Sequence, residues 1–151
     1  MVDQFGALSR RRLVILGGPG SGKTTLAVQL LLGLLGTRAP EDPVPVLLTL
    51  AGWDLAAHPR LQDWVAARLG EDYPALRALD AALPRALVDH GMVVPVLDGL
   101  DELPKGYRPQ VLTALNASLG ATVWGSNIGI LGLDLRVTVL NSIMLRSGTR
   151  W

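Results

Sequence analysis

The sequence predicts an α/β fold in which a mainly parallel sheet is flanked by helices in three layers. Two short apolar runs, 13–16 and 92–97, have the length and composition of buried strands. Each run is followed by a turn containing glycine and then by a segment with apolar residues at helical spacing. Strands that alternate with helices are typical of parallel sheets, because neighbouring parallel strands need a crossover connection.

Composition limits the classes of protein to which this chain can belong. Its 151 residues suffice for one domain with a core, and 49% of them are apolar. A net charge of +1 argues against nucleic-acid binding through a large basic face. The absence of cysteine excludes disulfides and thiolate metal sites. With no signal peptide and no apolar run long enough to span a bilayer, we expect a cytoplasmic protein without a membrane segment.

The remaining elements follow from the same periodicities. We predict a lead-in at 1–12, a second strand at 44–50, a connector at 51–59, and helices at 22–35, 61–69, 75–89 and 108–119. Pro45 fits the start of a strand or an edge strand, and Pro84 should split or kink its helix. His58 and His90 are far from any partner at metal-ligand spacing, so we interpret both as ordinary histidines.

The turn after the first strand has the spacing G-x-x-x-x-G-K-[ST], which is the phosphate-binding loop. The candidate nucleotide-binding residues are Gly17, Gly18, Pro19, Gly20, Ser21, Gly22, Lys23, Thr24 and Thr25. Glycines let successive backbone N–H groups face one anion, and the start of the following helix adds a positive dipole. In this motif Lys23 reaches the β- and γ-phosphates, and the Thr24 hydroxyl coordinates Mg²⁺. A plain glycine turn is the competing interpretation, but the flanking strand and helix favour nucleotide binding.

A second chemical centre follows the strand at 92–97. The strand ends in Asp98, whose carboxylate can hold Mg²⁺ beside Thr24. Hydrolysis needs another carboxylate that polarises water, and Glu102 is the first candidate and Asp101 the second. Helix capping or a solvated turn would also explain two acids here, but three acids after one buried strand exceed what a cap requires.

Together these motifs resemble a NACHT domain, a member of the STAND class of P-loop NTPases, in its bacterial and especially actinobacterial form. Residues 17–25 and 93–103 carry the resemblance, supported by 44–53 and 61–69. It implies a three-layer P-loop NTPase core over 13–119, acting as a signalling or defence switch that self-associates on activation. It also implies that Lys23 binds phosphate, that Asp98 serves Mg²⁺, and that Asp101 and Glu102 serve the attacking water.

The chain departs from that family after residue 119. Relatives continue with a strand that lies between the two motif strands and ends in a polar or arginine sensor of the γ-phosphate. Here the candidates are a strand at 121–124 followed by Ser126 or Asn127, and one at 136–140 followed by Asn141 or Ser142. The tail 120–151 otherwise does not align with the family, and the helical modules that close over the base have no room, so we expect a truncated member.

The predicted function is therefore Mg²⁺-dependent binding and slow hydrolysis of a nucleoside triphosphate. ATP is favoured over GTP because no Asn-Lys-x-Asp guanine motif is present. One alternative is a nucleotide-binding scaffold that does not hydrolyse, since sensor and lid are missing. Another is a P-loop kinase, but its arginine-rich lid is not apparent in the scattered Arg108, Arg136, Arg146 and Arg150.

Overall fold

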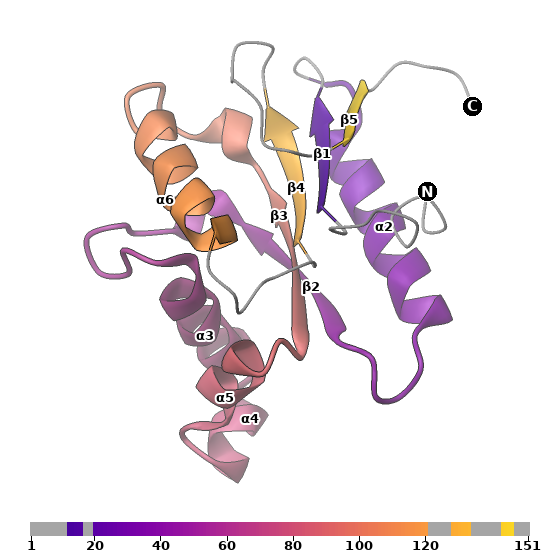
Figure 1. Ribbon diagram of the computed structural model, residues 1–151, viewed down its shortest axis with the longest axis vertical. Coiled ribbons are helices and arrows are strands. Elements are labelled where there is room, and N and C mark those ends of the chain that lie inside the picture. Colours follow the sequence, from indigo (N-terminus) through magenta and orange to yellow (C-terminus); the bar gives the residue numbers. More distant parts are fainter. Residues whose placement is uncertain (1–11, 17–19, 121–127, 134–142, 147–151) are drawn as a thin grey trace.

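The computed structural model describes residues 12–16, 20–120, 128–133 and 143–146 and contains a five-stranded sheet with the order β2-β3-β4-β1-β5 (Figure 1). The strands are β1 (Arg12–Leu16), β2 (Val44–Thr49), β3 (Val93–Asp98), β4 (Ile128–Leu133) and β5 (Ile143–Arg146). Every pairing between neighbouring strands is parallel. The predicted α/β class with a parallel sheet is therefore confirmed.

Helices cover both faces of this sheet (Figure 1). The described helices are α2 (Lys23–Thr37), α3 (Leu61–Asp72), α4 (Pro74–Leu79), α5 (Leu83–Asp89) and α6 (Arg108–Gly120), with short 3-10 helices η1 (Leu50–Gly52) and η2 (Leu100–Glu102). Helix α2 lies on one face, and α3 and α6 lie on the other. Helices therefore lie in the connections from β1 to β2, from β2 to β3 and from β3 to β4, as crossovers between parallel strands require.

Strand β3 is buried along its whole length and divides the core into two parts. On one face, Val94 and Val96 pack with Ala27 and Leu30 of α2. The other face of β3 contributes Val93 and Leu97 to a larger cluster with α3, α5 and α6. Because successive side chains of a strand alternate between its faces, Asp98 belongs to the face that α2 covers. The alternation of side-chain direction along β3 therefore places its terminal carboxylate on the face of the sheet that α2 covers.

The larger cluster is centred on two stacked tryptophans. The rings of Trp53 and Trp64 lie 5.3 Å apart between centroids, with 15° between their planes. Each indole N–H donates to a backbone carbonyl, from Trp53 to His58 and from Trp64 to Gly52. These bonds satisfy polar groups that burial would otherwise leave without partners. They fix the connector between β2 and α3, at the carboxyl end of the sheet.

Two prolines show how local chemistry sets the element boundaries. Strand β2 is at the edge of the sheet, which is where the missing N–H of Pro45 is tolerated. The predicted helix at 75–89 does split, but the break falls before Pro84, at Asp80, whose carboxylate accepts the N–H of Ala82. Pro84 itself occupies the first turn of α5, where its ring is compatible with a helix.

The strand that bridges the two motif strands is not at either expected position. It is β4, which pairs with β1 through five register positions and with β3 through Val96 and Leu97. The candidate strands at 121–124 and 136–140 lie outside the described residues. Gly129 and Gly132 interrupt the apolar run of β4, and this weakened its strand signature in the sequence. The sequence left open whether the tail supplies a further strand; the tail does supply one, and it is Ile128–Leu133.

Candidate functional site

The two predicted motifs meet at one edge of the sheet. In a parallel sheet the carboxyl ends of all strands lie at the same edge, and Lys23 and Asp101 follow the carboxyl ends of β1 and β3. The Lys23 Nζ lies 2.9 Å from the Asp101 Oδ2, so the phosphate loop and the acidic turn are in direct contact. Residues nearly 80 positions apart in the chain thus form one charged site.

The phosphate loop has the backbone conformation for which its glycines are needed. Gly20 and Gly22 have φ angles of 71° and 79°, in the left-handed region that side-chain-bearing residues rarely adopt. Gly22 precedes the first residue of α2 and has no side chain with which to cap the helix. The first turn of α2 also contains no acidic residue. The N-terminal end of α2 thus has neither a capping side chain nor an acid in its first turn, and its dipole attracts an anion.

The side chains at the start of α2 differ in their exposure. Lys23 is buried, with 7% of its side chain exposed, whereas Ser21, Thr24 and Thr25 are exposed. A buried ammonium group can bind an anion with little competition from water, while the exposed hydroxyls beside it stay accessible to a hydrated cation. Gly17, Gly18 and Pro19 lie outside the described residues.

The acidic turn begins at a second left-handed glycine, Gly99, with φ 81°. A Cβ atom at this position would lie 3.4 Å from the Glu102 Oε2 and 3.4 Å from the Thr49 Cγ2. The Glu102 carboxylate thus lies close over the glycine, next to the end of β2. Asp98 is buried and Glu102 is exposed, while Asp101 is intermediate. The three acids therefore have three different environments.

The two predicted Mg²⁺ ligands come from different motifs: Thr24 is in the first turn of α2, and Asp98 is the last residue of β3. Among the described residues, no cluster of three or more His, Cys, Asp or Glu side chains forms a protein-only metal cage. Mg²⁺ is commonly held by one or two protein oxygens, several waters and the phosphates of its nucleotide. A hydroxyl and a single buried carboxylate fit that mode of binding.

Sequence reasoning missed one residue at this edge, Arg108. Its Nε donates to the Leu103 carbonyl at 2.8 Å, and its Nη2 donates to the Asp101 carbonyl at 2.5 Å. The sequence pattern alone suggests Arg108 only as a scattered candidate for a kinase lid. The available signal was an arginine at the first position of a helix that follows an acidic turn, where a cation is unfavourable for the helix dipole.

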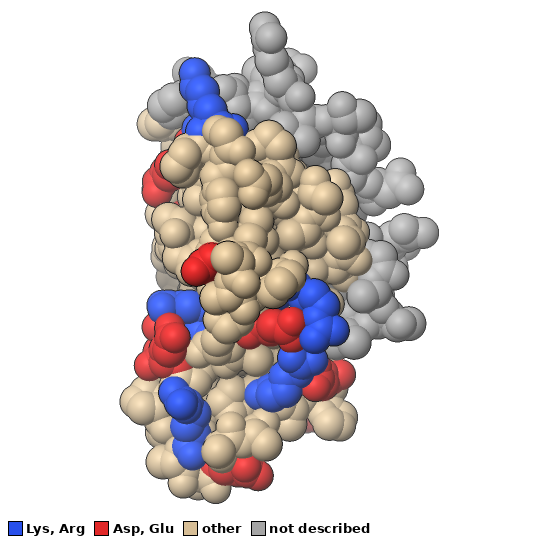
Figure 2. All heavy atoms as spheres, turned by 90° about the vertical axis from the view of Figure 1, so that its left-hand side faces the viewer, with Lys and Arg blue, Asp and Glu red and all other residues tan. Residues whose placement is uncertain are grey.

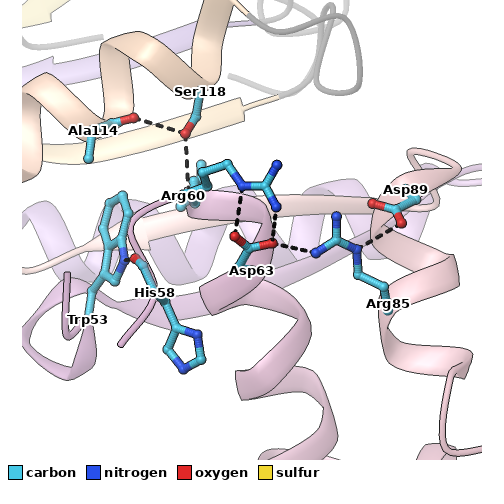
Figure 3. Close-up of polar contacts among 9 residues, drawn as sticks. Trp53, His58, Arg60, Asp63, Arg85, Asp89, Ala114 and Ser118 are labelled. Atoms are coloured by element: carbon cyan, nitrogen blue, oxygen red, sulfur yellow. Dashed lines mark hydrogen bonds and ion pairs between the residues drawn. The ribbon is translucent and has the colours of Figure 1, made fainter. Parts of the chain in front are cut away.

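A second charged cluster joins α3 and α5 (Figure 3). Asp63 accepts hydrogen bonds from Arg60 and Arg85, and Arg85 also bonds to Asp89. Hydrogen bonds from Arg60 and then Arg85 lower the pKa of Asp63, an effect partly opposed by burial. The Asp89 and Asp63 carboxylates raise the pKa of Arg85. In Figure 2, charges of both signs are interspersed over this region, without a continuous basic face.

The tail residues predicted as phosphate sensors do not have the expected relation to the bridging strand. In the sequence, Ser126 and Asn127 come directly before β4 and do not follow it. Asn141 and Ser142 likewise precede β5, and all four lie outside the described residues. The reason is the shift of the bridging strand to Ile128–Leu133.

We compared the chain with known protein families, curated proteins and solved structures. No protein-family model, curated protein or solved structure matches the chain. Within the described part of the chain, no helix is both long and apolar enough to cross a bilayer.

Proposed function

We propose that this chain is a Mg²⁺-dependent nucleoside-triphosphate-binding domain that hydrolyses its nucleotide slowly. The observation that carries the proposal is the 2.9 Å contact between Lys23 of the phosphate loop and Asp101 of the acidic turn. Each motif alone has a structural explanation as a turn or cap. Their meeting at the carboxyl edge of a parallel sheet is the arrangement in which α/β proteins bind ligands.

The proposed roles follow from position and exposure. Lys23 and the start of α2 bind the β- and γ-phosphates, in an environment with little competing water. Thr24 and Asp98 hold Mg²⁺, which supplies charge neutralisation when it is bound with the nucleotide. Glu102, the exposed acid of the turn, orients and polarises the attacking water. Asp101 is the alternative for that role, although its carboxylate is paired with Lys23.

The finer fold we propose is a three-layer P-loop NTPase core of the NACHT type. The strand order supports it, since β4 separates the two motif strands as in that family. On this proposal the domain is a cytoplasmic signalling or defence switch that favours ATP and self-associates on activation. These further properties rest on the resemblance of the motifs.

A second candidate is a nucleotide-binding scaffold without hydrolysis. It rests on the sequence, in which Ser126 and Asn127 come before β4 and do not follow it as a sensor of the γ-phosphate would. In P-loop enzymes the chemistry depends on positioned groups around the γ-phosphate, so a missing sensor would reduce turnover more than binding.

Calorimetric titration of the purified chain with Mg·ATP, Mg·GTP and the diphosphates, with phosphate release measured in parallel, separates these candidates. Binding with slow release is the expected result, with ATP preferred. Binding without release would support the scaffold instead. No binding of any of the four nucleotides would contradict both.

A further inference from the structure

Arg108 connects the first residue of α6 to the backbone of the acidic turn. Its two hydrogen bonds end on the carbonyls of Asp101 and Leu103, which are the residues immediately before and after Glu102. One guanidinium group therefore holds the chain on both sides of the proposed water-polarising acid. The Glu102 N–H in turn donates to the Gly99 carbonyl at 3.1 Å, which closes the turn.

The backbone of Arg108 is held by α6, which is anchored in the core. Its backbone N–H donates to the Pro104 carbonyl at 3.2 Å, and α6 is anchored by the fully buried Val111 and Leu115. The neighbouring Tyr107 hydroxyl accepts the Leu55 N–H and donates to the Trp53 carbonyl, which joins the same corner to the connector after β2. The guanidinium is therefore held on the core, and through it the core constrains the acidic turn.

A cation in the first turn of a helix is opposed by the helix dipole. Hydrogen bonds from a charged donor to a neutral carbonyl are stronger than those between neutral groups, so the two carbonyls offset that cost. The planar fork of arginine also fixes two acceptors relative to each other, which a lysine ammonium group cannot do. The location of Arg108 at the start of α6 and its guanidinium group thus both suit a role in fixing the shape of the acidic turn.

We infer that Arg108 is a positioning residue that sets the Glu102 carboxylate for hydrolysis; this inference rests on the proposed function. It acts through the backbone of the turn, and it does not contact the nucleotide. Its loss should consequently reduce turnover while leaving the affinity for Mg·ATP nearly unchanged.

The test compares Arg108→Met and Arg108→Lys with the wild type in phosphate release and in Mg·ATP titration. Arg108→Met should lower the release rate about 30-fold, because small misplacement of a catalytic group has large kinetic effects. Its affinity should stay within about threefold. Arg108→Lys should be intermediate, since one donor is retained. Lys105→Met, which removes an exposed cation from the same loop, is the matched control and should behave as wild type.

A double-mutant cycle with Glu102→Gln distinguishes positioning from a general structural defect. If Arg108 acts through Glu102, Arg108→Met should cost less than about threefold in the Glu102→Gln background. Equal losses in both backgrounds would overturn the inference. Failure of wild-type phosphate release would instead overturn the proposed hydrolysis, on which the role of Arg108 depends.

Amide hydrogen exchange tests the contact itself without nucleotide. In Arg108→Met, exchange across residues 99–103 should accelerate while α3 and β3 stay protected. Unchanged exchange in this turn would show that Arg108 does not hold it, whatever the chain hydrolyses. Accelerated exchange everywhere would show a global loss of stability and would also contradict a local positioning role.

Discussion

The Lys23–Asp101 pair and the cluster around Asp63 contain the same kinds of charged groups in different surroundings. Lys23 and Asp101 have 7% and 21% of their side chains exposed, and they join two turns at the edge of the sheet. In the Asp63 cluster, Arg60 is 68% and Arg85 is 44% exposed. Three of the four groups in that cluster lie on two neighbouring helices, where they bridge α3 and α5.

This difference in burial distinguishes a candidate binding site from a cluster that only joins two helices. Burying an ammonium group is costly, even beside a carboxylate such as Asp101. At the start of α2 the dipole also opposes the charge of Lys23. Such a cost is understandable if the lysine has a strongly anionic ligand. The exposed arginines around Asp63 lose little hydration, and each pair contributes at most about 1 kcal/mol. The two clusters should therefore respond to substitution in different measurements.

The largest expected effect concerns turnover at the sheet edge. Glu102→Gln removes the charge that polarises water but keeps the shape of the side chain, so phosphate release should fall about 10²- to 10⁴-fold. Binding of Mg·ATP should persist. Glu71→Gln, in the charged α3–α5 region, is the matched control and should leave the release rate unchanged. Equal release by Glu102→Gln and wild type would move the role to Asp101 or remove it.

Affinity should depend on the buried lysine. Lys23→Ala removes the cation from the phosphates, and the affinity for Mg·ATP should fall on the order of 100-fold. Isothermal titration measures this loss, and the melting temperature checks that the variant is folded. Lys105→Ala provides a lysine control at an exposed position of the acidic loop. An unchanged affinity of Lys23→Ala would contradict the phosphate role and leave the pair with Asp101 as a structural contact.

The backbone of the phosphate loop can be tested by making the same substitution at Gly22 in the loop and at Gly36 in α2, which serves as the control. Gly22 has a φ of 79°, so Gly22→Ala should destabilise the fold by about 1–2 kcal/mol and weaken nucleotide binding. Gly36 lies inside α2 with open space around its Cβ position, so Gly36→Ala should be neutral or stabilising by up to about 1 kcal/mol. Chemical denaturation measures both values. Equal effects would show that the left-handed turn is not required.

The smallest effect belongs to the Asp63 cluster and depends on pH. The folded-state pKa of Asp63 is lowered, so its stabilisation is present above the unfolded value of about 3.9 and is lost as pH falls below it. Asp63→Asn should therefore lower the free energy of unfolding by less than about 1 kcal/mol near pH 7. The difference in the free energy of unfolding between Asp63→Asn and the wild type should become smaller below about pH 4. Denaturation curves at several pH values measure it, and nucleotide affinity should not change.

Much of the fold was predictable from local patterns. The glycines of the phosphate loop and the uninterrupted apolar character of β3 identify two motif strands, and parallel pairing then puts their ends together. The contact between Lys23 and Asp101 is a consequence of that topology. The division of roles between Asp101 and Glu102 was not predictable in this way, because it depends on the path of a short turn.

The remaining features depend on contacts that a local pattern does not contain. Strand β4 has glycines in place of apolar residues, and its position between β1 and β3 depends on pairing with distant segments. Arg108 contacts carbonyls five and seven residues earlier, through a turn whose shape is set by Gly99. Asp63 is joined to Arg85 across two helices, at a separation of 22 residues. Such tertiary contacts explain why the tail was misjudged and Arg108 was missed.

A crystal structure of the chain with Mg²⁺ and a non-hydrolysable ATP analogue tests the central proposal most directly. We expect the β- and γ-phosphates at the start of α2, with Lys23 bonded to them, and Mg²⁺ bound near Thr24 and Asp98. Glu102 should face the γ-phosphate across one water. A nucleotide bound elsewhere, or phosphates that leave Lys23 bonded only to protein groups, would contradict the proposal that the two motifs form one nucleotide site.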